Sequence, residues 1–121
     1  MAIRDMNELK PKFRAILEDA LAEAREAGLD PVVIETYRPQ SRQDELFAQG
    51  RTTHGHVVTW TRHSKHTLRL AADVCPRVNG QIVWSRRDLF DRWGAIAEKH
   101  GLTWGGRFSN YDGVHVQAAW A

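Results

Sequence analysis

Two stretches organise the chain: residues 64–73, Ser-Lys-His-Thr-Leu-Arg-Leu-Ala-Ala-Asp, and residues 112–115, Asp-Gly-Val-His. Together they supply two histidines and two carboxylates. Zinc binds imidazole nitrogen and carboxylate oxygen, and a catalytic zinc site keeps three protein ligands and leaves a fourth position for water. The residue types therefore suit a site in which two histidines and one aspartate hold zinc while the second aspartate acts as a base.

The spacing of His66 and Asp73 restricts how such a site is built. They are seven residues apart, which does not fit the four-residue step of two ligands on one helical face. The spacing favours a loop followed by a strand, and residues 70–74 read as that strand. On spacing alone, the competing interpretation is a set of unrelated polar residues, because the chain holds six histidines.

The second stretch predicts a strand that presents its polar residues to a cleft. Val114 and Val116 alternate with His115 and Gln117, so His115 and Gln117 should share one face. Asp112, three residues before His115, is placed to accept a proton from water without binding the metal itself.

Other polar residues are weaker candidates. Arg38 follows a predicted strand, at a position where loops often present functional groups, although a solvated surface ion pair explains it equally well. His54, His56 and His63 lack a second ligand at a standard spacing. We expect these three to be exposed or, at most, to line a substrate groove.

The composition predicts one domain over residues 1–121. With 42% hydrophobic and 26% charged residues, the chain is an ordinary globular sequence. The net charge of +2 is small and its basic residues are dispersed, so nucleic-acid binding is a poor hypothesis. A lone Cys75 excludes an intrachain disulfide. The sequence shows no long apolar run and no leader pattern, so we expect no stable membrane association and no signal peptide.

Hydrophobic periodicity predicts the first half of the fold. A helix should start at an Asn7 cap and end near residue 27, where Gly28 follows. The β-branched stretch 31–37 should form a strand. Ser41 with Asp44 resembles a capping box, which predicts a short helix up to residue 50.

The second half contains the strongest turn signal. Asn79-Gly80 predicts a hairpin that joins the strand at 70–74 to residues 81–84. Ser85 should cap a helix that ends at residues 100–101. Residues 57–60 are a candidate short strand in an otherwise irregular segment.

At this point the sequence is recognisable. The pattern Ser64-x-His66-x-x-x-x-Ala71-x-Asp73, followed by Asp112-x-x-His115, resembles the signature of the zinc D-alanyl-D-alanine carboxypeptidase and dipeptidase family, which also contains phage L-alanyl-D-glutamate endopeptidases. Residues 36–51 and the triplet 104–106, Trp-Gly-Gly, resemble the phage endolysin branch of that family. The resemblance runs from about residue 33 to residue 117.

The resemblance implies a complete catalytic metal site. His66, Asp73 and His115 would hold one zinc ion, and Asp112 would be the general base and then the general acid. The implied fold is a small α+β domain, an antiparallel sheet with packed helices, as in D-Ala-D-Ala peptidases and the hedgehog N-terminal domain.

It also implies how the substrate is bound. Arg38 would contact the substrate and stabilise the transition-state oxyanion, while Ser64 would help to hold the substrate's carboxylate. The implied substrate is the stem peptide of bacterial peptidoglycan, cut between L-alanine and D-glutamate. D-Ala-D-Ala carboxypeptidase or dipeptidase activity is an alternative, and a non-catalytic zinc-stabilised binding domain is another, which the intact Asp112 disfavours.

One position departs from the family pattern. The usual glycine three residues after the first histidine is Arg69 here, which questions the local backbone because arginine lacks the conformational freedom of glycine. The resemblance further suggests an endolysin without a separate wall-binding module, acting as a monomer. Such an enzyme would accumulate in the host cytoplasm and reach the wall after holin-type release; a phage-tail or prophage component fits as well.

Overall fold

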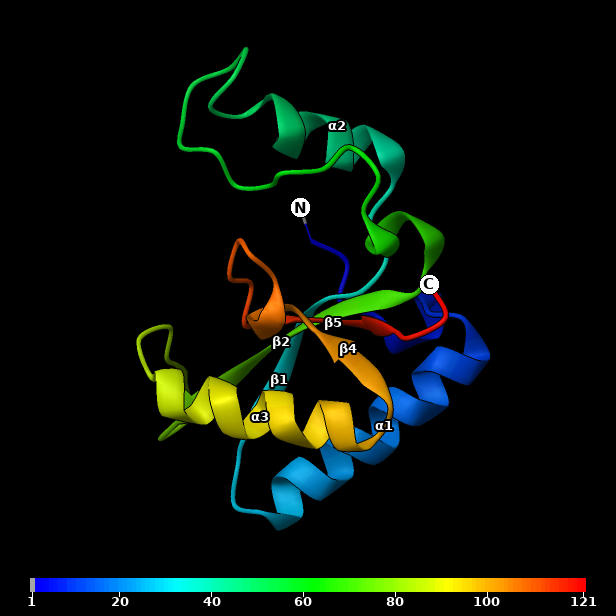
Figure 1. The fold of residues 1–121 in the computed structure, drawn as a ribbon, viewed down its shortest axis with the longest axis vertical. Coiled ribbons are helices and arrows are strands. Elements are labelled where there is room, and N and C mark those ends of the chain that lie inside the picture. The colour runs from blue at the N-terminus through cyan, green and yellow to red at the C-terminus, as the bar shows by residue number, and fades with distance from the viewer. Residues whose placement is uncertain (1) are drawn as a thin grey trace.

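The computed structural model describes residues 2–121, which form an antiparallel sheet flanked by helices (Figure 1). The strands are β1 (Pro31–Glu35), β2 (Ala71–Val78), β3 (Gln81–Ile82), β4 (Leu102–Trp104) and β5 (His115–Ala118). Their order in the sheet is β1-β2-β5-β4, and β3 pairs with β2. Every pairing is antiparallel, so the predicted α+β class is confirmed.

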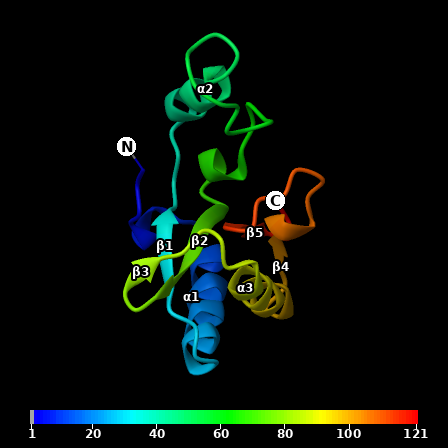
Figure 2. The ribbon, with the colours of Figure 1, turned by 90° about the vertical axis from the view of Figure 1, so that its left-hand side faces the viewer.

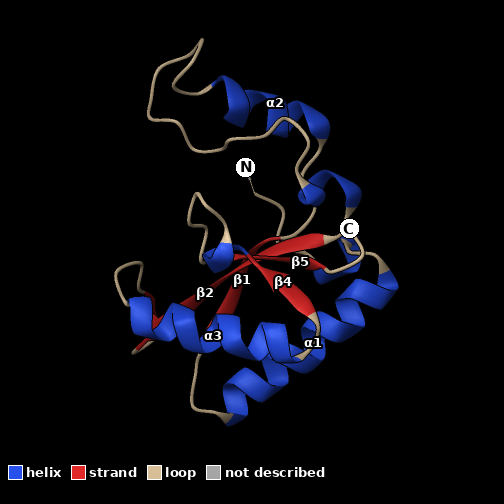
Figure 3. Ribbon diagram, viewed as in Figure 1, coloured by secondary structure: helices blue, strands red, loops and turns tan. Residues whose placement is uncertain are grey.

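Three α-helices accompany the sheet: α1 (Pro11–Glu26), α2 (Gln40–Ala48) and α3 (Arg87–Lys99). Figure 3 shows α1 and α3 together on one side of the strands, whereas α2 stands away from them on the other side. Three short 3₁₀ turns complete the fold: η1 (Met6–Glu8), η2 (Lys65–Leu68) and η3 (Gly105–Arg107). Within residues 2–121, no helix has both the length and the apolarity needed to span a membrane.

The hydrophobic core fills the space between the sheet and the α1–α3 layer. Its largest fully buried side chains include Phe13 and Leu17 from α1 and Trp93 from α3. On the central strand β2, Ala72 and Val74 belong to this core. Because strand residues alternate between faces, Asp73 between them points to the opposite face, which is the face that carries the site.

The start of the first helix differs from the prediction. Helix α1 begins at Pro11, not after Asn7, because proline lacks the N–H that a helix interior needs but suits the first helical position. Residues 6–8 instead form η1, which Asp5 caps by accepting a hydrogen bond from the Asn7 amide. Gly28 follows the helix with a φ of 88°, as expected for its end.

Two further predicted caps are wrong. Ser41 lies inside α2, whose first residue is Gln40 and whose N-cap position is Pro39 without a side-chain cap. Ser85 precedes the N-cap position of α3, which Arg86 occupies, also without a capping hydrogen bond. A sequence pattern identifies a suitable capping residue, but the chain direction set by tertiary packing decides which residue is used.

The hairpin prediction is confirmed, with a shorter second strand. Asn79 and Gly80 both have positive φ, 53° and 79°, which is the geometry of a two-residue turn of type I′. Strand β3 covers two residues instead of four. The predicted strand at 57–60 is wrong, because no strand of residues 2–121 includes this segment. Within it, the Thr59 carbonyl accepts a hydrogen bond from the Arg51 side chain instead of a strand partner.

Candidate metal centre and active-site cavity

Three polar residues form a row across three neighbouring strands. Asp73 on β2 is the direct partner of His115 on β5 and of Glu35 on β1. Glu35 reaches this row because the register of β1 shifts between Val33 and Glu35, and such a bulge re-aims the side chains that follow it. Antiparallel pairing thus brings residues from positions 35, 73 and 115 to one place on one face.

His66 joins this row from η2, the turn that precedes β2. The Ser64 hydroxyl caps η2 by accepting a hydrogen bond from the His66 amide at 3.2 Å. The side chain of His66 is 1% exposed and lies between the sheet and the carbonyl of Thr36. A turn followed by a strand is the arrangement that the seven-residue spacing predicted.

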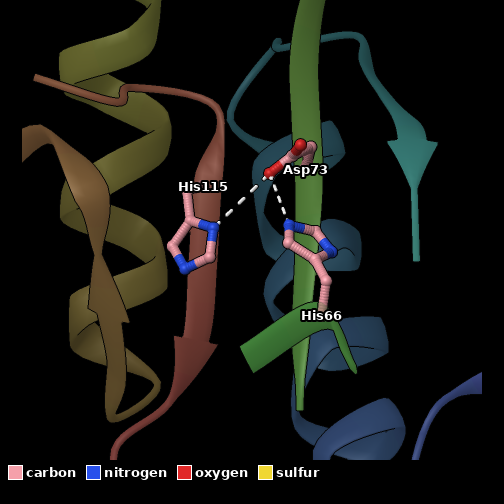
Figure 4. Close-up of side chains that lie close together, drawn as sticks. All are labelled: His66, Asp73 and His115. Atoms are coloured by element: carbon pink, nitrogen blue, oxygen red, sulfur yellow. Dashed lines mark hydrogen bonds and ion pairs between the residues drawn. The ribbon is translucent and has the colours of Figure 1, made fainter. Parts of the chain in front are cut away.

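The side chains of His66, Asp73 and His115 converge (Figure 4). Asp73 Oδ1 lies 3.1 Å from His66 Nε2 and 3.6 Å from His115 Nδ1. One ligand atom from each residue lies within 4.8 Å of the other two. Two ligands bound to one tetrahedral zinc at 2.0–2.1 Å are about 3.3 Å apart, so the two distances from Asp73 Oδ1 suit zinc ligands.

The outer nitrogen of each imidazole ring has a partner that fixes the ring. His66 Nδ1 lies 2.7 Å from the Thr36 carbonyl, and His115 Nε2 lies 2.8 Å from Gln117 Oε1. Because both oxygens accept hydrogen bonds, these outer nitrogens carry hydrogens, so the neutral form of each ring has its inward nitrogen available to bind a metal ion. Zinc-binding histidines are oriented in this way by a second oxygen partner.

Electrostatics at the centre favour a bound cation. Burial alone would raise the pKa of Asp73, but its hydrogen bonds to His115 and His66 outweigh burial and hold the pKa well below its ordinary value. Burial lowers the pKa of His115, yet the Asp73 carboxylate and the Gln117 oxygen overcome this effect and raise it. The aspartate is therefore ionised, and a proton or a metal ion offsets its charge.

Arg38 lies beside the centre and is 9% exposed. Its Nε and one terminal nitrogen donate to Glu35 at 3.2 and 2.5 Å, and its other terminal nitrogen donates to Gln43 at 2.7 Å. The guanidinium also lies 3.8 Å from Asp73 Oδ2. Two carboxylates and an amide thus hold Arg38 in one orientation at the wall of the cavity.

Asp112 lines the same cavity and its side chain stays accessible. Desolvation by the surrounding wall, followed by repulsion from Asp73, raises the pKa of Asp112. A carboxylate with a raised pKa is a stronger base, so the shift favours the acceptance of a proton from water. Its main-chain position is fixed, since the Asp112 amide donates to the Gly105 carbonyl and the Asp112 carbonyl accepts from the His115 amide, both at 3.0 Å.

The Trp-Gly-Gly triplet shapes the turn that carries Asp112. A Cβ atom at Gly105 would lie 2.3 Å from the Asp112 carbonyl oxygen, and one at Gly106 would lie 2.2 Å from the Trp104 ring. Trp104 also donates from its indole nitrogen to the Gly113 carbonyl at 2.8 Å. Glycine at both positions therefore permits the close approach that fixes the loop between β4 and β5.

The cavity beside the metal centre has a volume of about 540 Å³. Its floor contains the three metal-site residues and Arg38, one wall is formed by residues 58–61, and the other by residues 108–112. Ser64 also lines it, and its contact with a substrate stays a prediction. His63 lines the cavity, whereas His54 and His56 are exposed and lie outside the set that forms it.

Arg69 adopts a left-handed backbone conformation, with φ 64° and ψ 28°. This is a conformation that glycine adopts freely and that costs other residues about 1–2 kcal/mol. The side chain compensates by pairing with Glu8 and by stacking its guanidinium 3.8 Å from the centre of the Tyr37 ring. Arginine in place of the family's glycine thus leaves the turn of η2 intact, and the contacts of Arg69 connect this turn to the N-terminal segment.

Several residues of the site were not identified from the sequence. Glu35 and Gln43 hold Arg38, and Thr36 orients His66. Glu35 stands three residues before Arg38, a spacing that could have indicated an ion pair. Gln117 was placed on the face of His115, and the structure shows that the two side chains also interact.

Comparisons with known proteins agree with this geometry. A family model described as D-alanyl-D-alanine carboxypeptidase matches residues 58–118. The peptidoglycan L-alanyl-D-glutamate endopeptidase CwlK of Bacillus subtilis (strain 168) is 33% identical, and the alignment covers 91% of this chain and 76% of CwlK.

Solved structures share the fold. The Serratia marcescens L-Ala D-Glu endopeptidase ChiX superimposes with a TM-score of 0.75 at 20% identity, covering 98% of this chain and 88% of ChiX. A mutant of the vancomycin-resistance D,D-pentapeptidase VanY in complex with Zn(II) superimposes with a TM-score of 0.67 at 17% identity, covering 92% and 72% of the two chains. The chain therefore belongs to the family of D-alanyl-D-alanine carboxypeptidases and peptidoglycan L-alanyl-D-glutamate endopeptidases.

Proposed function

We propose that this protein is a zinc peptidase that hydrolyses the stem peptides of bacterial peptidoglycan between L-alanine and D-glutamate. The observation that carries the proposal is the convergence of His66, Asp73 and His115 at the floor of a cavity that Asp112 and Arg38 also line. A purely structural zinc site is closed, whereas this one opens to a cavity and has a free carboxylate beside it.

The proposed chemistry assigns one task to each group. Zinc, when bound, supplies a Lewis acid and a water of lowered pKa. Asp112 accepts the proton of the attacking water and delivers it to the amine that leaves. Arg38, fixed by Glu35 and Gln43, donates to the oxygen of the scissile carbonyl as negative charge develops there. Ser64 keeps its own hydroxyl hydrogen available for a substrate carboxylate, because its oxygen is the acceptor in the cap of η2.

The choice of the scissile bond rests on CwlK, the relative whose sequence is similar to this chain. CwlK is named an L-alanyl-D-glutamate endopeptidase and matches 91% of this chain. The stretch from Arg38 to Arg51, which contains α2, also resembles the endopeptidase branch. Removal of a terminal D-alanine is the competing outcome, since the family model carries the carboxypeptidase description.

The test is digestion of purified peptidoglycan followed by mass spectrometry of the soluble products. Cleavage at the proposed bond releases peptides with a new D-glutamate N-terminus, and the Asp112→Asn variant should release none. Release of D-alanine instead would assign the protein to the carboxypeptidase branch. No release from any wall type, with zinc still bound, would favour a binding domain.

The proposal extends to the biological setting that the resemblance suggested. A monomeric endolysin with one zinc ion, made in a host cytoplasm and released to the wall by a holin, would meet this substrate from the inside. Support for this setting is the sequence pattern of residues 36–51 alone. Lysis of host cells on co-expression with a holin, and survival with the protein alone, would be the expected result.

A further inference from the structure

Trp60 is exposed at the mouth of the cavity. Its side chain is 66% exposed, although it lines the same cavity as His66 and Asp73. Another tryptophan, Trp84, is similarly exposed at 64% but does not line the cavity. An accessible indole at the entrance to an active site presents a large flat apolar surface together with one N–H donor.

The backbone that carries Trp60 is fixed on both sides by side chains of α2 and of the residues after it. Arg51 donates to the Thr59 carbonyl at 3.1 Å, and Gln43 donates to the Thr61 carbonyl at 2.6 Å. Gln40 donates to the Arg62 carbonyl at 2.9 Å. The segment has no regular secondary structure, yet the carbonyls of Thr59, Thr61 and Arg62 are all hydrogen-bonded, so the indole is presented from an ordered support.

The same support connects to the catalytic residues. Gln43 also accepts a hydrogen bond from Arg38, so one buried amide joins the loop at Thr61 to the guanidinium beside the metal centre. The Arg51 guanidinium lies 3.9 Å from the Phe47 ring centre and 5.9 Å from that of Trp60. Figure 2 shows α2 and this loop as one projecting lobe, clear of the sheet.

The cavity has a mixed lining. Besides the metal-site residues it includes charged side chains such as Arg42 and Lys65, and the stretch around Trp60 adds the uncharged polar residues Thr59 and Thr61. Ser109 and Asn110 line the same cavity. An aromatic surface rimmed by hydroxyl and amide groups suits a sugar, which has an apolar C–H face and a rim of hydroxyls.

The chemistry of the substrate places a sugar close to this position. In peptidoglycan, the L-alanine of the stem is attached through a lactyl group to an N-acetylated sugar. One residue and the lactyl group thus separate the scissile bond from the ring. An extended residue spans about 3.3–3.6 Å, so the sugar must lie on the order of 10 Å from the scissile carbonyl.

We propose that Trp60 is a stacking platform for the muramyl sugar to which the scissile stem peptide is attached. This inference rests on the proposed function and adds a substrate class to it: peptides still joined to their glycan. Trp60 would act in substrate recognition and leave the chemical step at Asp112 unchanged. The enzyme should therefore prefer a muropeptide to the same peptide without the sugar.

The experiment compares two soluble substrates, a muropeptide and the same stem peptide with an N-acetyl group in place of the lactyl sugar. Wild-type protein should show the higher kcat/KM on the muropeptide. Trp60→Ala should lower that value about 5- to 10-fold, through KM, and lower the free-peptide value by clearly less, so that the preference for the muropeptide shrinks. Trp60→Phe should retain most of the preference, and Trp84→Ala, matched in exposure, should behave as the wild type.

The outcomes separate this inference from the function on which it rests. Equal kcat/KM values of the wild type on both substrates, or an equal loss on both in Trp60→Ala, would overturn the sugar platform and leave the peptidase intact. Failure of the wild type to cut either substrate would contradict the peptidase proposal itself, and this inference with it. The melting temperature of each variant verifies that it is folded. If Trp60→Ala does not fold, Trp60→Phe still allows the two substrates to be compared.

Discussion

Asp73 and His115 face each other across the β2–β5 pairing, and the carboxylate of one lies 3.6 Å from the ring nitrogen of the other. The relationship is set by strand register, so a one-residue slip of β5 would turn His115 towards the core. The hydrophobic residues Val74 and Val116 oppose such a slip, because both are fully buried on the other face. The register that fills the core therefore also assembles the metal centre.

Asp112 should be required for turnover but not for zinc binding. Replacing it with Asn removes the base but keeps the size of the side chain, so kcat on peptidoglycan should fall by about 10²–10⁴. Zinc content measured on the purified variant should equal that of the wild type. Loss of zinc from Asp112→Asn would show that Asp112 is a ligand and not the base.

Gln117 should strengthen zinc binding without touching the metal. Its Oε1 accepts from His115 Nε2 at 2.8 Å, and removing such a partner typically costs 10–100-fold in metal affinity. Gln117→Ala should therefore bind zinc about 10-fold more weakly in a competition titration with a chromophoric chelator. The control is Gln81→Ala, an exposed glutamine on β3; an equal loss in both variants would contradict the orienting role.

Zinc binding should depend steeply on pH and release a proton. The pKa of His115 is raised in the metal-free protein, despite the opposing effect of burial, because Asp73 stabilises the imidazolium. Zinc needs the neutral ring, so below this raised pKa the apparent affinity should fall about tenfold per pH unit. Calorimetry in buffers of different ionisation enthalpy measures the number of protons released when zinc binds. A zinc affinity that is independent of pH between 5 and 7 would contradict the assignment of His115 as a ligand.

The same shift predicts the stability of the metal-free protein. A histidine whose folded pKa is raised contributes stability that is fully present below its unfolded pKa of about 6.5 and is lost as the pH rises through the folded pKa. The contribution of His115 to the free energy of unfolding should thus decrease from pH 6 upwards. Zinc, which replaces the proton as the partner of Asp73, should remove this decrease.

Arg69 should show the signature of a strained turn residue. Arg69→Ala keeps the left-handed backbone but loses the contacts to Glu8 and Tyr37, so it should be the least stable form. Arg69→Gly loses the same contacts without the strain and should be more stable than Arg69→Ala by about 1 kcal/mol. Urea denaturation of both variants measures the difference.

A matched control for this comparison is Arg77, which pairs with Asp30 at 2.7 Å from within strand β2. Here glycine should be the less stable replacement, because the extended backbone needs no positive φ and glycine weakens strands. If the glycine variant were more stable than the alanine variant at both positions, the backbone conformation of Arg69 would not explain the result.

The sequence predicted those parts of the fold that depend on local patterns. The periodic helices, the Asn79-Gly80 hairpin and the alternation around His115 were correct because neighbouring residues determine them. The start of α2 after Pro39 and the irregular segment around Trp60 were predicted incorrectly, because contacts between distant residues determine both. The bulge that brings Glu35 beside Asp73 has no local signal, since it appears only when β1 pairs with β2.

The candidate site was predicted in the same uneven way. The motif residues His66, Asp73 and His115 were proposed from spacing and resemblance, and the fold brings their side chains together. Thr36 was missed because a carbonyl 30 residues away from His66 leaves no pattern in the sequence. For Glu35, the three-residue spacing to Arg38 was a usable signal, but its place beside Asp73 depends on the bulge in β1.

The most direct test of the account is an activity titration of metal-free protein with zinc, using peptide release from purified peptidoglycan as the readout. We expect no release without metal, a linear rise to one zinc per chain, and a plateau beyond it. The His115→Ala variant should need far more zinc or remain inactive. Full activity of the metal-free protein, or an unchanged titration in His115→Ala, would contradict the assignment of His66, Asp73 and His115 as the site of the catalytic zinc.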